Sequence, residues 1–181
     1  LVTGAGRGIG RAIAEVLAQC GADVTLCARS QGEIEAVAAA LRDAGHSAQA
    51  MACDVTDSES VADLIAEVAP FDVLVNNAGT NRPKPQSEVT ADDYDAVMDL
   101  NVRAVFFATQ AVTAKMVAAG RGGSIITISS QMGHVGAANR TVYCASKWAI
   151  EGFTKALAIE LGPHGIRVNT ICPTFIETPM T

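Results

Sequence analysis

Short apolar runs alternate along this chain with longer stretches in which apolar positions recur every three or four residues. The short runs are rich in Val, Ile or Leu and predict buried strands, whereas the longer stretches predict amphipathic helices. The predicted strands are 23–28, 47–53, 71–76, 124–129 and 166–172, after a short first strand at 1–3. The predicted helices are 8–20, 32–44, 57–69, 91–119 and 141–161. This alternation is typical of βαβ units and predicts a doubly wound α/β fold with a parallel sheet.

Several helix ends have recognisable signals. Thr56-Asp57-Ser58-Glu59 matches a capping box at the start of a helix. Gly45 and Gly120 directly follow predicted helices, where a residue able to adopt positive φ is favoured. Gly162-Pro163 is expected to end the last helix.

Composition narrows the class of protein. The 181 residues are 49% hydrophobic and 18% charged, which is enough for a substantial core and predicts a single domain over 1–181. The formal net charge of -6 disfavours nucleic acid as a partner. No apolar run reaches the roughly 18 residues of a membrane-spanning helix, and no signal-peptide pattern is present. We therefore expect no membrane partner and a cytoplasmic location.

The cysteines and the chain ends add two expectations. Cys20, Cys27, Cys53, Cys144 and Cys172 are irregularly spaced and include no Cys-x-x-Cys pair, so we expect neither a metal site nor a disulfide scaffold. The chain begins without Met and ends in a loop after its last strand, so we expect truncation at both ends.

A glycine-rich turn joins the first strand to the first helix. Unpaired N–H groups and the helix dipole at such a turn form a site for a pyrophosphate. The spacing is G-x-x-x-G-x-G, not G-x-G-x-x-G, and an ordinary tight βα turn remains an alternative for this segment alone. The residues expected to contact a nucleotide here are Gly4, Gly6, Arg7, Gly8, Ile9 and Gly10.

The end of the second strand indicates which nucleotide would bind. An acid there would accept hydrogen bonds from a ribose 2′-hydroxyl, but this chain has Ala28, Arg29 and Ser30. Arg29 and Arg7 could hold a 2′-phosphate by charge-assisted hydrogen bonds, although each alone could be a solvated surface charge. Their joint placement favours NADP(H) over NAD(H).

Ser130, Tyr143 and Lys147 form a candidate catalytic set. Tyr143 and Lys147 are four residues apart and share one face of a predicted helix. A phenol has a pKa near 10, so general acid–base catalysis at neutral pH needs stabilisation of phenolate by about 4 kcal/mol, which an ammonium and a nicotinamide cation could supply. Ser130 follows a strand at the carboxyl edge of the sheet, where its hydroxyl could bind a substrate oxygen. An exposed helix pair without a role is the alternative.

In these motifs and their order the chain resembles the short-chain dehydrogenases/reductases over essentially its whole length. The glycine turn matches Thr3 to Gly10, and the family's adenine-contacting Asp matches Asp54, followed by Val55. The Asn-Asn-Ala-Gly segment is 76–79, which adds Asn77, Ala78 and Gly79 to the nucleotide-binding candidates. The resemblance implies a Rossmann-type three-layer αβα sandwich.

The resemblance also implies a catalytic tetrad of Asn101, Ser130, Tyr143 and Lys147. Tyr143 would be the general acid/base, Lys147 would bind the nicotinamide ribose and lower the pKa of Tyr143, Ser130 would orient the carbonyl, and Asn101 would hold a water in a proton relay. Tyr143 and Lys147 would thus also contact the cofactor. The nicotinamide loop would contribute Pro173, Ile176 and Thr178, with Pro173-Thr174 in place of the family's Pro-Gly.

Within the family, segments such as Ser130-Gln131, 142–144 and 160–164 resemble the L-xylulose and dicarbonyl (carbonyl) reductase branch. This implies an NADPH-dependent oxidoreductase acting on a small polar carbonyl, a sugar or a polyol. Arg140 replaces that branch's His three residues before the tyrosine. The substrate-contact candidates are Ser130, Gln131, Arg140 and Tyr143, with His134 near the mouth of the site and Asn81 and Arg82 weaker.

Two other functions stay open. A 3-oxoacyl-carrier-protein reductase has a similar pattern, but its carrier protein would need a basic patch, and Arg103, Lys115 and Arg121 are sparse. A non-catalytic NADP(H)-sensing protein on the same fold would be expected to lose the tyrosine, which this chain keeps.

The two longest predicted helices have apolar residues on more than one face. Val105, Phe106, Val112 and Met116 share one face of the first, and the second has Trp148, Phe153 and Leu157. Because the family commonly pairs through the equivalent helices, we expect a homotetramer or homodimer.

Overall fold

The computed structural model describes residues 1–177 and contains a six-stranded, all-parallel sheet in the order β3-β2-β1-β4-β5-β6. This confirms the predicted doubly wound α/β fold. The predicted nicotinamide-loop residue Thr178 lies outside the described residues. The strands are β1 (Val2–Thr3), β2 (Val24–Ala28), β3 (Ala48–Ala52), β4 (Val73–Asn76), β5 (Gly123–Ile128) and β6 (Ile166–Ile171).

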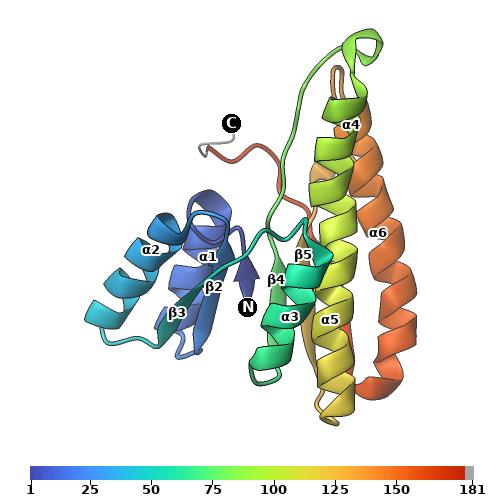
Figure 1. Ribbon diagram of the computed structural model, residues 1–181. Helices are drawn as coiled ribbons and strands as arrows, with labels where there is room; N and C mark the ends of the chain where they lie inside the picture. The colour runs from blue at the N-terminus through green and yellow to red at the C-terminus, as the bar shows by residue number, and fades with distance from the viewer. Residues whose placement is uncertain (178–181) are drawn as a thin grey trace.

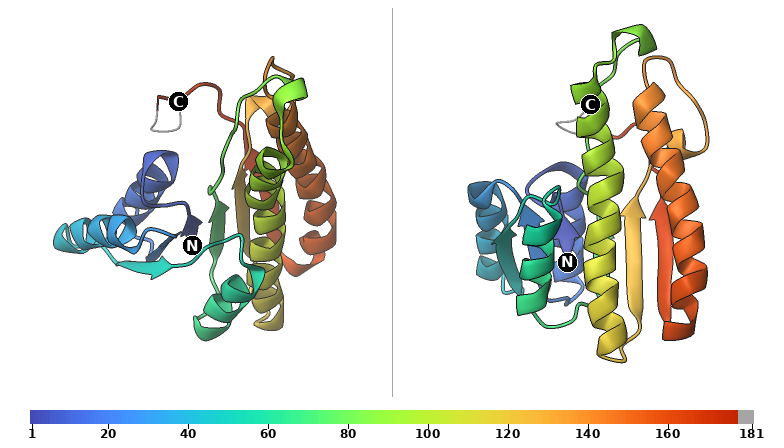
Figure 2. Two further views of the ribbon diagram at one scale, coloured as in Figure 1. Left: turned by 45° about the horizontal axis from the view of Figure 1, so that its top comes forward. Right: turned by 45° about the vertical axis from the view of Figure 1, so that its right-hand side comes forward.

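Helices cover both faces of the sheet (Figure 1). α1 and α2 lie on one side, and α3, α5 and α6 lie on the other. The helices are α1 (Gly8–Gln19), α2 (Gln31–Asp43), α3 (Ser58–Glu67), α4 (Ala91–Met98), α5 (Ala104–Ala118) and α6 (Thr141–Leu161). Short helical turns are η1 (Gln86–Glu88), η2 (Asp99–Arg103), η3 (Gln131–Gly133) and η4 (Gly162–His164). Figure 2 shows α5 and α6 side by side, and Phe106 and Phe153 join them with ring centroids 5.4 Å apart.

Each buried strand contributes to two separate cores because successive side chains of a strand point to opposite faces. Leu74 and Val75 of β4 are both buried, Leu74 against α3 and α5 and Val75 against α1 and α2. Leu26 and Cys27 of β2 divide in the same way. The continuous apolar runs of the sequence are therefore the two-sided burial that a parallel sheet requires.

The strand order reverses between β1 and β4, which are neighbours in the sheet although β2 and β3 separate them in sequence. In open parallel sheets a crevice forms outside the carboxyl ends of the strands at such a point. Gly4 and Asn77 directly follow these two strands. The topology therefore brings the glycine turn and the 76–79 segment to one edge.

The expectation that all strands are fully buried is wrong at the sheet's edges. β3 and β6 are edge strands, and only Ala48 of β3 and Ile166 and Val168 of β6 are buried. An edge strand has a neighbour on one side only, so less of it is covered. Likewise Phe106 is 43% exposed, whereas Val105, Val112 and Met116 of the same predicted face are buried in the core.

Two local expectations about helices need correction. The predicted capping box at 56–59 does not form, because the Thr56 hydroxyl donates to the Asp54 carboxylate and Asp57 is the N-cap of α3, accepting from Glu59 and Ser60 N–H groups. The predicted helix 91–119 is helical throughout 91–118 but contains one π-helical turn, η2, between α4 and α5. Such turns are frequent at functional sites.

The expected helix-ending glycines are confirmed. Gly45 and Gly120 have φ of 86° and 63°, and α6 ends at Leu161 directly before Gly162. Among residues 1–177, no helix is both long and apolar enough to cross a membrane.

Lys115 on α5 caps the carboxyl end of α3. Its ammonium donates to the carbonyl oxygens of Ile65 at 2.7 Å and Ala66 at 2.8 Å, and also to that of Val68. These carbonyls lack partners inside their own helix and carry the negative end of its dipole, so a cation there is favourable.

We predict that Lys115→Met lowers the free energy of unfolding by about 1–2 kcal/mol, the cost of losing charged hydrogen bonds to a helix end. Urea denaturation measures this. The control is Lys155→Met on the exposed side of α6, which is expected to change stability by less than about 0.5 kcal/mol. Equal stability of the two variants would contradict the capping role.

Candidate active site

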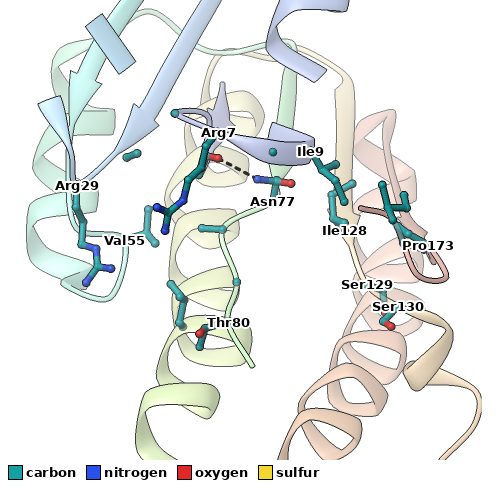
Figure 3. A pocket seen from close by; sticks show the side chains of 18 of the residues that line it. Arg7, Ile9, Arg29, Val55, Asn77, Thr80, Ile128, Ser129, Ser130 and Pro173 are labelled. Carbon is teal, nitrogen blue, oxygen red and sulfur yellow. Dashed lines mark hydrogen bonds between the residues drawn. The ribbon is translucent and has the colours of Figure 1, made fainter. Parts of the chain in front are cut away.

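A cleft with a volume of about 290 Å³ runs along the carboxyl edge of β1, β4 and β5. Figure 3 shows Arg7 and Arg29 toward one end and Ser130 and Pro173 toward the other, with Asn77 between them. The glycine turn, the end of β2, the 77–80 segment and α6 all contribute lining residues. One elongated site therefore brings together motifs that are far apart in the sequence.

The glycine turn needs its glycines for two different reasons. Gly4 and Gly8 have φ of 64° and 56°, a region that side chains disfavour. Gly10 is needed for space, since a Cβ there would lie 2.3 Å from Nδ2 of Asn77 and 2.4 Å from the Gly4 carbonyl oxygen. Gly10 therefore lies behind the cleft and supports the turn, whereas Gly4, Gly6 and Gly8 line the cleft.

Hydrogen bonds hold the 77–80 segment against this turn. Asn77 Nδ2 donates to the carbonyl oxygens of Thr3 at 3.0 Å and Gly4 at 3.2 Å. The Thr3 hydroxyl accepts from the N–H groups of Asn77 at 3.0 Å and Ala78 at 3.1 Å. Asn77 thus acts on the turn's backbone, and Ala78 and Gly79 line the cleft beside it.

The two arginines proposed to select the nucleotide both line the cleft, and both face acids. Arg7 is 4.0 Å from Glu33, and Arg29 is 3.9 Å from Asp54. Their side chains are 73% and 75% exposed, so these ion pairs are weak. Both guanidinium groups therefore lie toward the same end of the cleft. Each can leave its carboxylate for another partner at a small cost in free energy.

Ser130, Tyr143 and Lys147 lie at the opposite end. Lys147 is buried, and its ammonium donates to the Ile128 carbonyl oxygen at 2.9 Å, 5.6 Å from the centre of the Tyr143 ring. Ser130 is buried at the start of η3, where its hydroxyl accepts from the Met132 N–H at 3.1 Å. All three line the cleft, as the sequence predicts for a catalytic set.

Burial dominates the protonation of this set. It lowers the pKa of Lys147 from 10.5 to about 8, although Cys172 and Glu151 act in the opposite direction. Burial also raises the pKa of Tyr143, against a hydrogen bond with Ser130 and the charge of Arg140. The predicted lowering of the Tyr143 pKa is therefore not found when only the protein's own groups act on the phenol. These groups instead keep the phenol protonated, the form that can donate a proton.

Asn101 lies behind the cleft and does not line it. It sits on the π turn η2, is 1% exposed, and its Oδ1 accepts from Thr80 N–H at 2.8 Å. Its Nδ2 donates to the Thr80 carbonyl oxygen at 2.9 Å and to the Ser146 hydroxyl at 3.1 Å. Ser146 in turn donates to the Tyr143 carbonyl oxygen at 2.7 Å. The side chain therefore ties the cleft wall to α6.

The cleft agrees with much of the predicted site. Predicted residues outside its lining are Gly10, Asn101, Gln131 and Arg140, together with the weaker candidates Asn81, Arg82 and His134. Lining residues that the sequence motifs did not reveal include Glu33, Cys53, Thr80, Leu100, Ile128 and Ser129. Thr80 directly follows the 76–79 segment, so extending that motif by one residue would have found it. Glu33 gives no such signal, because only the packing of α2 brings it to the cleft.

The fold and the cleft together define a Rossmann-type nucleotide-binding oxidoreductase. The model of the family described as "short chain dehydrogenase" matches residues 1–181. The chain therefore belongs to the short-chain dehydrogenase family, whose members are oxidoreductases acting on CH–OH groups.

Individual relatives agree with this assignment. The chain is 40% identical over 180 residues to an L-xylulose reductase of Bos taurus, covering 99% of this chain and 72% of that protein. It superposes with a TM-score of 0.95 and 39% identity on a putative NAD(P)-dependent gluconate 5-dehydrogenase from Beutenbergia cavernae with bound NADP, covering 99% and 73% of the two chains. A metagenomic short-chain oxidoreductase in complex with NADP gives a TM-score of 0.90 at 38% identity, covering 95% and 80%.

The buried ammonium of Lys147 predicts a pH-dependent stability. Because its pKa is about 8 in the folded protein and 10.5 when unfolded, the unfolded chain binds more protons between these values, and stability rises with pH there. Relative to Lys147→Met, the wild type should gain up to about 3 kcal/mol from pH 8 to 10.5. Urea denaturation of both proteins at several pH values measures the difference, with Lys155→Met as control. A difference independent of pH would contradict it.

Proposed function

We propose that this protein catalyses hydride transfer between NADP(H) and a ketone or secondary alcohol, with a small polar carbonyl, sugar or polyol as substrate. The observation that carries the proposal is one cleft that is lined by Ser130, Tyr143 and Lys147 and also by the glycine turn, with Ser130 toward one end and Arg7 and Arg29 toward the other. This arrangement fits NADP(H), which has its nicotinamide ring at one end and the 2′-phosphate of its adenosine at the other.

The residues of the cleft suit such a cofactor. Gly4 and Gly8 at positive φ leave the turn's N–H groups open to a pyrophosphate at the start of α1. Asp54 and Val55 would contact the adenine. Ser30 and the two arginines would contact the 2′-phosphate. Pro173 and Ile176 would contact the nicotinamide. NADP(H) when bound would supply or accept the hydride. The bound NADP of the Beutenbergia cavernae and metagenomic structures supports this choice of cofactor.

The protein's own groups would handle the proton. In reduction, the Tyr143 hydroxyl donates a proton to the carbonyl oxygen while the Ser130 hydroxyl donates a hydrogen bond to it. Lys147, whose ammonium donates to the Ile128 carbonyl, would bind the ribose and replace the proton on Tyr143. The Asn101–Ser146 link positions α6, and with it Tyr143.

Relatives named for sugars and sugar acids, L-xylulose and gluconate, support this substrate class. Gln131, which directly follows Ser130, and Arg140, three residues before Tyr143, are the proposed specificity residues. A carrier-protein substrate is not favoured, since Lys115 caps α3, Arg121 pairs with Asp72 at 2.5 Å, and Arg103 stacks on Phe107. We also propose a homo-oligomer, because Phe106, Trp148 and Ile159 expose apolar surface on α5 and α6.

Tyr143→Phe tests the chemistry. Loss of the proton donor should lower kcat at least about 100-fold while the NADPH dissociation constant changes by less than about threefold. NADPH oxidation with diacetyl, L-xylulose and an acetoacetyl thioester measures turnover, and fluorescence titration measures binding. Tyr94→Phe, outside the cleft, is the matched control. Unchanged turnover in Tyr143→Phe would refute the mechanism, and NADPH binding by the wild type without turnover of any substrate would favour a sensor.

Arg29→Ala tests the choice of nucleotide. If Arg29 binds the 2′-phosphate, its loss should weaken NADPH binding by about tenfold or more and leave NADH binding within about threefold. Titration of both nucleotides measures this. Arg121→Ala serves as control, because Arg121 lies before β5 at the opposite edge of the sheet. Equal weakening for both nucleotides would mean that Arg29 does not distinguish them.

A further inference from the structure

Three side chains of metal-ligating type meet beside the cleft, although they are far apart in the sequence. His134 follows η3, Glu151 lies on α6, and Cys172 follows β6. Their candidate ligand atoms all lie within 4.8 Å of one another. None of the three has a role in the proposed hydride transfer.

Each pair of these groups comes close to the edge length of a zinc coordination tetrahedron, with the Glu151 carboxylate meeting the other two groups through different oxygens. His134 Nε2 is 3.3 Å from Cys172 Sγ and 3.7 Å from Glu151 Oε2, and Cys172 Sγ is 3.4 Å from Glu151 Oε1. Zinc bonds of about 2.0–2.3 Å to nitrogen, oxygen and sulfur at tetrahedral angles separate the ligand atoms by about 3.4–3.6 Å. A rotation of the Glu151 carboxylate and a small approach of the three groups would therefore place an ion between them.

The surroundings hold these groups in place. Glu151 is 7% exposed, and its Oε2 accepts from the Thr170 hydroxyl at 3.2 Å, the kind of outer contact that orients a carboxylate ligand. Gly133 lets the loop approach α6, since a Cβ there would lie 3.0 Å from Glu151 Cγ. His134 is half exposed at 52%, which leaves a path from solvent.

We propose that His134, Glu151 and Cys172 form a binding site for a single divalent transition-metal ion, Zn²⁺. The nitrogen, carboxylate and thiolate set matches the ligand preference of zinc, and three protein ligands leave a fourth position for water. On binding, the Cys172 thiol loses its proton to solvent, and thiolate plus carboxylate balance the ion's charge. Sequence spacing excludes local zinc motifs only, so this site revises the expectation of no metal.

The ion would join three segments that form the wall of the cleft. Glu151 is one helical turn after Lys147, Cys172 directly precedes Pro173, and His134 is four residues after Ser130. Zinc is therefore expected to stabilise the folded protein, because it binds the folded arrangement and the unfolded chain lacks it. The proposal does not depend on the hydride-transfer function, and its test needs no turnover.

Co²⁺ titration of the reduced, metal-free protein tests the site, because a cobalt–thiolate bond gives an absorption band that nitrogen and oxygen ligands do not. We expect the band to saturate at one equivalent and to disappear on adding Zn²⁺. Cys172→Ser should abolish the band, and His134→Ala should weaken binding at least about tenfold. Zn²⁺ should raise the melting temperature of the wild type and of neither variant.

Matched controls are Cys20→Ser and His164→Ala, both exposed, which should bind like the wild type. His134→Ala removes an exposed side chain, so it decides the matter if Cys172→Ser does not fold. Absence of a thiolate band in the wild type, a band that survives Cys172→Ser, or unchanged affinity in His134→Ala would each overturn the proposal.

Discussion

The close contact between the glycine turn and the end of β4 is the constraint on which the site depends. Asn77 donates to the carbonyl oxygens of Thr3 and Gly4, and the Thr3 hydroxyl accepts from the N–H groups of Asn77 and Ala78. These bonds cross the point where the strand order reverses, so they join the two halves of the sheet. Gly10 must be glycine for the contact to exist, because any Cβ would overlap Asn77.

The same contact places the next residues of the chain in the cleft wall. Ala78 and Gly79 line the cleft beside Asn77, and a Cβ on Gly79 would lie 3.3 Å from Oδ1 of Asn101. Asn101 then reaches Ser146 on α6. Two sets of hydrogen bonds, joined through the backbone of the 77–80 segment, thus connect the nucleotide-binding turn to the helix that carries Tyr143.

The fold could be predicted because its central strands are buried on both faces and its helices on one, so each leaves a distinct apolar period. The local predictions that failed lie where several polar groups compete for the same hydrogen bonds. Thr56 has the right spacing for a capping box, but Asp54 takes its hydroxyl and Asp57 becomes the N-cap. The π turn at Asn101 left no apolar signal either, because helical periodicity continues on both sides of it.

The residues of the site also fall into those that could be predicted from the sequence and those that could not. Residues within local motifs, such as Tyr143 and Lys147 one turn apart, could be placed from sequence because helix geometry fixes their spacing. Glu33 could not, nor could the cluster of His134, Glu151 and Cys172, because only tertiary packing brings them together. The direction of the shift in the Tyr143 pKa could not be predicted from the sequence either. Burial raises this pKa more than the partners of the phenol lower it, and burial is a property of the fold.

The acids beside the two arginines bear on the choice of cofactor. Their effect depends on how the free energy of each ion pair compares with that of an arginine–phosphate bond. Glu33 and Asp54 pair with Arg7 and Arg29 at 4.0 and 3.9 Å, with most of each guanidinium exposed. Exposed pairs of this kind contribute about 0–1 kcal/mol, whereas charge-assisted bonds to a phosphate are shorter and about twice as strong as neutral ones. A 2′-phosphate can therefore displace the carboxylates as partners of the arginines. The weak pairs with the acids therefore leave both arginines available to NADP(H).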